Sequence, residues 1–163
     1  LALALAAAAR GLGRAPDSRR GWAVAGVLAV ALVVASAWLT HANGRLEYRA
    51  PLMALTVLHQ AAAAIWLGGL VQLAALGRAA AREPAVDARW PELVARFSRL
   101  AMGAVIALVA SAAPLAWTYT GSAAALVGTG YGSLVVTKSL LLLAAIIGAI
   151  FLARRPEGDE RAN

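Results

Sequence analysis

Two histidines and a single lysine are the side chains best able to do chemistry in this sequence, because they lie in or beside long apolar runs. His59 lies about seven residues inside one such run, or roughly 10 Å deep at the helical rise. In a membrane, an ionisable group at that depth is a candidate metal ligand or proton carrier. The alternative is a neutral imidazole that hydrogen-bonds a neighbouring helix, worth about 1 kcal/mol of packing. The sequence leaves both interpretations open.

Four further side chains are candidates for a site around His59. His41 ends an apolar run, where a histidine either caps the helix carbonyls or supplies a second imidazole ligand. Met53 offers a thioether, although it stands about 120° from His59 around a helix. Trp66 falls on the face of His59 and would wall the site on its inner side. Lys138 either snorkels to the membrane surface or faces the bundle at nearly the depth of His59.

The composition excludes most classes of soluble protein. Hydrophobic residues make up 61% of the 163 residues and charged residues 14%, against roughly 45–50% and 25% in soluble domains. A net charge of +7 would ordinarily suggest a nucleic-acid partner, but these arginines flank apolar runs, as they do when they orient a membrane protein. The absence of cysteine removes disulfides and thiolate metal sites. We expect a protein in a lipid bilayer that is not an enzyme and binds no nucleic acid.

Four stretches reach the roughly 20 apolar residues that a membrane-spanning helix needs. They cover residues 22–40, about 52–76, about 100–117 and about 133–153. Each is too long for a strand and apolar on all sides, as a helix between lipid and protein must be. The sequence therefore predicts an all-α, polytopic membrane helix bundle over residues 10–163, with four complete transmembrane helices. Residues 1–9 are interpreted as the tail of a preceding apolar segment, the end of an earlier spanning helix.

The connectors between these stretches alternate in charge. Arginine is concentrated before the first stretch, in residues 77–98 and after the fourth stretch, whereas residues 119–132 carry no charge. The positive-inside rule places the arginine-rich connectors in the cytoplasm and residues 119–132 outside. We therefore expect a multi-pass protein of the inner (plasma) membrane.

Arg96 and Ser98 lie just before the third apolar stretch, where we expect structural roles. Arg96 can anchor to anionic lipid headgroups, which contributes about 1 kcal/mol per basic residue. Ser98 is placed to cap the helix that we expect to follow it.

Three segments resemble the copper resistance protein D family. They are HQAAAAIWLGGL (59–70), RFSRLA (96–101) and TGYG (129–132) followed by Lys138 and a leucine run, and they occur in the family's order over about residues 58–143. The resemblance implies a multi-helix inner-membrane protein of copper uptake or tolerance, often part of a longer chain. It also implies a periplasmic copper-binding partner.

The residues themselves are compatible with copper as a transported ion but not with tight storage. Imidazole suits copper, whereas Cu(I) favours sulfur, and the chain has no cysteine and two methionines. A transport path needs weak, passable sites, so His59 and His41 would suffice for copper admitted from the outer side. The charge of Lys138 would oppose a nearby cation, and the sequence does not resolve this conflict.

Two alternatives remain open. A haem-binding electron carrier needs axial histidines on facing helices, and the two histidines allow at most one such haem. A structural membrane subunit of a longer protein would need no chemistry at all.

The orientation can be tested by cysteine labelling, because the natural chain has no cysteine. We expect Ala124→Cys to react with a membrane-impermeant thiol reagent in intact cells, and Ala80→Cys to react only after lysis, since arginine excess puts its connector inside. Labelling of Ala80→Cys but not Ala124→Cys in intact cells would reverse the orientation.

Overall fold

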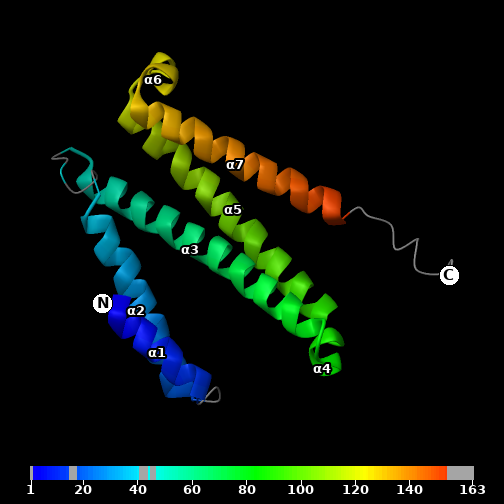
Figure 1. The fold of residues 1–163 in the computed structure, drawn as a ribbon. Helices are drawn as coiled ribbons and strands as arrows, with labels where there is room; N and C mark the ends of the chain where they lie inside the picture. The colour runs from blue at the N-terminus through cyan, green and yellow to red at the C-terminus, as the bar shows by residue number, and fades with distance from the viewer. Residues whose placement is uncertain (1, 15–17, 41–43, 45–46, 154–163) are drawn as a thin grey trace. The chain divides into compact units, whose positions relative to one another are not determined.

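The structure is a computed structural model that describes residues 2–14, 18–40, 44 and 47–153, and its regular elements there are all helices (Figure 1). Four of the described helices are long and apolar enough to cross a membrane: α2 (Arg19–Trp38), α3 (Arg49–Ala80), α5 (Trp90–Thr120) and α7 (Gly130–Ala153). Shorter helices are α1 (Ala2–Arg14), α4 (Pro84–Asp87) and α6 (Ala123–Gly128). The predicted all-α bundle with four spanning helices is confirmed.

Helices α3 and α5 are both longer than the apolar stretches that predicted them. Hydropathy falls where polar residues begin, but alanine, leucine, arginine and glutamate continue a helix readily. Pro91 lies in the first turn of α5, where its missing N–H breaks no helical hydrogen bond. The predicted connector 77–98 is therefore mostly helical, with α4 between the two long helices.

The start of α2 and the end of α5 are capped in ordinary ways. The Ser18 side chain accepts a hydrogen bond of 3.0 Å from the Gly21 N–H at the start of α2. Helix α5 ends at Thr120, and the next residue, Gly121, has a left-handed φ of 68° and donates its N–H to the Trp117 carbonyl at 2.9 Å. Glycine adopts this conformation without the Cβ clash that stops other residues.

The chain divides into two compact units, Leu1–Leu115 and Ala116–Asn163. In the first unit α2 packs against both α1 and α3. The Ser36 hydroxyl of α2 lies 2.7 Å from Oε1 of Gln60 on α3, a polar contact between the two helices. Residues 2–14 are thus a helix held against α2, and their continuation of an earlier spanning helix stays a prediction.

Helices α3 and α5 meet along one stripe of each, which we call the α3–α5 seam. The buried members of α5 are Ala104, Leu108, Ser111 and Leu115, spaced four, three and four residues apart. This is the spacing with which one helix keeps a single face toward a partner. Large apolar side chains on other faces, such as Ile106 and Val109, are more than half exposed, as lipid-facing residues are.

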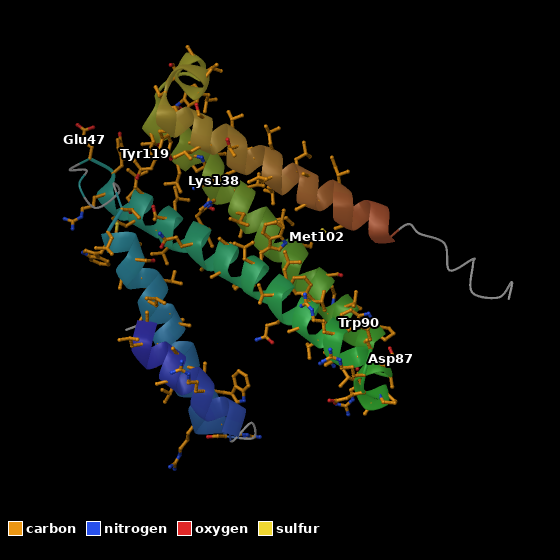
Figure 2. All side chains as sticks on the ribbon, viewed as in Figure 1. Glu47, Asp87, Trp90, Met102, Tyr119 and Lys138 are labelled. Atoms are coloured by element: carbon orange, nitrogen blue, oxygen red, sulfur yellow. The ribbon has the colours of Figure 1, made fainter. Side chains whose placement is uncertain are left out.

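Two glycines of α3 make room for aromatic side chains of α5 at one end of the seam. A Cβ on Gly69 would lie 2.9 Å from Cδ2 of Phe97, and one on Gly77 would lie 3.0 Å from Cη2 of Trp90. Figure 2 shows Trp90 beside Asp87, at the end where α4 joins the two helices. Gly68, by contrast, has no heavy atom within 4 Å of the same position. Of the glycine pair, only Gly69 is used for close packing.

In the second unit, α6 packs against the first turns of α7. A Cβ on Gly132 would lie 2.5 Å from Cα of Leu126, so glycine is required for this contact. The Thr129 hydroxyl accepts a hydrogen bond of 3.0 Å from the Gly132 N–H and so caps α7. Tyr119 and Tyr131 stack edge to face with ring centroids 5.7 Å apart.

We expect Gly69→Ala to lower the thermal stability of the purified protein, because the new methyl group enters the Phe97 ring. Overpacking of this kind costs about 1–3 kcal/mol. Gly68→Ala is the matched control, since open space and better helix propensity should leave stability unchanged or slightly higher. The double variant Gly69→Ala/Phe97→Leu should recover part of the loss. Equal melting temperatures for Gly69→Ala and Gly68→Ala would contradict the predicted contact.

Candidate metal site around His59

His59 projects from α3 into the α3–α5 seam. Its Nδ1 atom lies 3.1 Å from the Ser111 hydroxyl oxygen and 3.3 Å from the Leu108 carbonyl oxygen, both on α5. The side chain is half-buried, whereas Ser111 is fully buried. The imidazole therefore lies between two helices, with one ring nitrogen held by α5.

Sequence analysis did not identify Ser111 as part of this site. Serine is common in membrane helices because its hydroxyl can bond a carbonyl one turn back, and Ser111 does so to Ala107 at 2.6 Å. Its position in the sequence could have identified it, because Ser111 follows Leu108 by three residues and precedes Leu115 by four, the spacing of one helix face. A polar residue on an otherwise apolar packing stripe marks a position where a polar side chain of the facing helix can find a partner.

Other polar side chains near His59 on α3 are also bonded. Gln60 contacts Ser36 of α2, as described above. Thr56, one turn before Gln60, is buried and donates to the Leu52 carbonyl at 2.8 Å. No buried side-chain nitrogen or oxygen lacks a hydrogen-bond partner in the part of the chain that the structure describes.

The structure describes three of the four remaining candidates. Trp66 is half-buried and lies two turns after His59 on the same face of α3, as predicted. Met53 is also half-buried and precedes His59 on α3. Lys138 is an exposed residue of α7, in the second unit (Figure 2). His41 lies outside the described residues. The joint use of any of these with His59 stays a prediction.

No group of three or more histidine, cysteine, aspartate or glutamate residues lies together within the described ranges. The described contacts of His59 place its imidazole beside one hydroxyl oxygen and one carbonyl oxygen. Such a set suits weak and transient metal contact better than a closed, high-affinity site.

The predicted cap at Ser98 is wrong. Helix α5 begins at Trp90, so Ser98 lies inside it, exposed, and donates to the Val94 carbonyl at 2.8 Å. Arg96 also lies inside α5 rather than before it, and pairs with Glu92 one turn back at 2.6 Å. Phe97 lies between these two residues and packs on Gly69, so the RFS segment contacts the WLGGL segment of α3.

These helices, with a histidine held between two of them, define a multi-pass membrane protein. Residues 91–157 match the family model described as Copper resistance protein D, which confirms the family resemblance seen in the sequence. The match includes the RFS segment and the glycine-rich segment with Lys138, whereas His59 and the WLGGL segment precede it. No curated protein and no solved structure matches the chain.

We expect Arg96→Ala to leave copper binding intact and to lower stability or membrane yield slightly. Its ion pair with Glu92 is exposed and of the i,i+4 type, worth about 0.3–0.5 kcal/mol. Arg96→Lys keeps the charge at this position and should retain the parent yield. Yield and melting temperature measure the effect, and loss of copper binding by a well-folded Arg96→Ala protein would contradict a purely structural role.

Proposed function

We propose that this chain transports copper, or confers copper tolerance, in the inner membrane and admits copper from the outer, periplasmic side. His59 is the copper ligand within the membrane in this proposal, and His41 is the second imidazole at the outer side. The family match supports copper as the ion, and four apolar helices support the membrane setting. A periplasmic copper-binding protein is the expected partner.

The observation that supports His59 most is its place between two spanning helices, with its Nδ1 atom in contact with α5. A histidine that only packs makes the same contact, so copper accumulation by the variants below decides between the two roles. In the proposal, a passing ion at His59 is screened from lipid by protein. Metal-ligating histidines commonly have their second ring nitrogen bonded to a carbonyl or another oxygen in this way.

The sparse donor set agrees with transport rather than storage. An ion path requires sites that bind strongly enough to admit the ion and weakly enough to release it. One imidazole next to neutral oxygens meets this requirement better than a cluster of thiolates or carboxylates. Lys138, which the proposal keeps as a candidate for gating, is tested separately because its charge opposes a nearby cation.

The decisive variant is His59→Leu, which removes the imidazole and keeps an apolar side chain of similar size. We expect it to insert normally and to lose copper-dependent accumulation in cells or vesicles, at matched protein levels. His41→Ala should give a milder defect. Lys138→Met, measured alongside, tests whether the lysine affects the same path.

Gln60→Leu is the matched control, because it removes the adjacent polar side chain and its contact with α2 but no imidazole. It should accumulate copper like the parent. A folded His59→Leu protein that also accumulates copper like the parent would show that His59 only packs. A visible absorption spectrum of the purified protein tests the haem alternative, since a bis-histidine haem gives intense bands and a copper-free helical protein gives none.

A further inference from the structure

At one end of the α3–α5 seam, the two helices present unlike surfaces to their surroundings. The helices run antiparallel there, since Gly69 of α3 faces Phe97 of α5 and Gly77 faces Trp90. The stretch of α3 between the two glycines therefore lies level with the stretch of α5 between the two aromatic residues (Figure 2).

The face of α3 that points away from the seam is apolar in this stretch. It consists of Leu67, Val71 and Ala74, which are spaced four and three residues apart like neighbours on one helix face. Leu67 and Val71 are 55% and 70% exposed. We call these three residues the α3 back stripe. Between Arg49 and Arg78 the helix contains no lysine, arginine or acidic residue, so the stripe suits contact with lipid tails.

The face of α5 that points away from the seam is charged at the same level. Its exposed charged residues recur at three, four and three residues, and we call them the α5 back stripe: Arg89, Glu92, Arg96 and Arg99. Arg89 directly precedes α5, and its carbonyl accepts a hydrogen bond of 3.1 Å from the Leu93 N–H, as a helical residue would. Three arginines and one glutamate give the stripe a net charge of +2.

The two stripes require different surroundings although they lie at one level. Exposed leucine and valine are most stable against lipid tails, whereas arginine avoids the hydrocarbon and reaches for the headgroups. Both requirements are met when this end lies at the membrane surface with the α3 back stripe toward the hydrocarbon. Helix α3 has 32 residues, or about 48 Å at the helical rise, which exceeds the roughly 30 Å of hydrocarbon and favours such an inclined position.

We propose that the α5 back stripe binds the headgroups of acidic phospholipids, with Arg99 as its main contact, while the α3 back stripe lies in the lipid tails. Arg96 is already paired with Glu92 at 2.6 Å, whereas no described carboxylate pairs with Arg99. Arg99 is also the last charge before the apolar stretch of α5. A guanidinium group matches phosphate oxygens in charge and in geometry. The proposal requires neither copper nor a particular side of the membrane.

The two faces can be compared with single cysteines, because the natural chain has none. Val71→Cys labels the α3 back stripe, and Ala95→Cys labels an exposed position on the back of α5 at the same level. The full chain carries a nitroxide in vesicles of phosphatidylcholine and phosphatidylglycerol, with oxygen or a water-soluble nickel chelate as the relaxing agent. We expect oxygen to relax the Val71→Cys label more strongly, and nickel to relax the Ala95→Cys label more strongly. The same preference at both positions would overturn the two-sided placement.

The lipid partner is identified by quenching of a fluorophore on Ala95→Cys. The vesicles contain rising fractions of phosphatidylglycerol or phosphatidylcholine that is brominated near the headgroup end of its acyl chains. We expect stronger quenching by phosphatidylglycerol, because the α5 back stripe enriches the acidic lipid beside the label. Arg99→Gln should lower this preference about fivefold, the effect of one basic residue near an anionic surface. Arg99→Lys keeps the charge and should retain most of the preference.

Arg49→Gln is the matched control, because it removes the same charge at the start of α3, about 33 Å along the helix from Val71. It should leave the lipid preference at the Ala95→Cys label unchanged. Equal quenching by the two lipids in the parent would refute acidic lipid as the partner. An equal loss of preference in Arg49→Gln and Arg99→Gln would refute a local surface, since net charge alone would then explain the enrichment.

Discussion

The structure depends on one constraint, which is that a polar group inside a hydrocarbon layer must find its partner within the protein. His59 meets this constraint through the α3–α5 seam, where Ser111 and the Leu108 carbonyl surround one ring nitrogen. The contact with α5 gives one ring nitrogen of His59 a hydrogen-bond partner inside the protein. The same contact also orients the imidazole ring between the two helices.

The seam brings together two of the segments that resemble the copper resistance protein D family. Phe97 of the RFS segment packs against Gly69 of the WLGGL segment, at the end of the seam away from Ser111. The family match to residues 91–157 includes only the first of these segments. A Cβ at position 69 would overlap the Phe97 ring, so the phenylalanine at 97 and the glycine at 69 depend on each other. Phe97 and Gly69 thus form a packing contact between the two segments.

Sequence alone predicted the four spanning helices and singled out His59 as a candidate, because length, hydropathy and an ionisable group in an apolar run need no tertiary information. It did not predict Ser111, whose partner depends on which stripe of α5 faces α3. It placed Ser98 before the third helix because the apolar stretch begins at about residue 100, whereas α5 itself begins earlier, at Trp90. The relation of Lys138 to His59 could not be derived either, since depth along two helices does not determine which faces meet.

His59 and Gln60 are consecutive on α3, yet they contact different neighbours, α5 and α2 respectively. Successive residues of a helix point about 100° apart, so these two contacts hold α3 from two sides at one level. Turning α3 about its axis in either direction would break at least one of them. The rotation of α3 about its own axis is therefore restrained by two neighbouring helices, and the contact with α5 still orients the imidazole when the contact with α2 is removed.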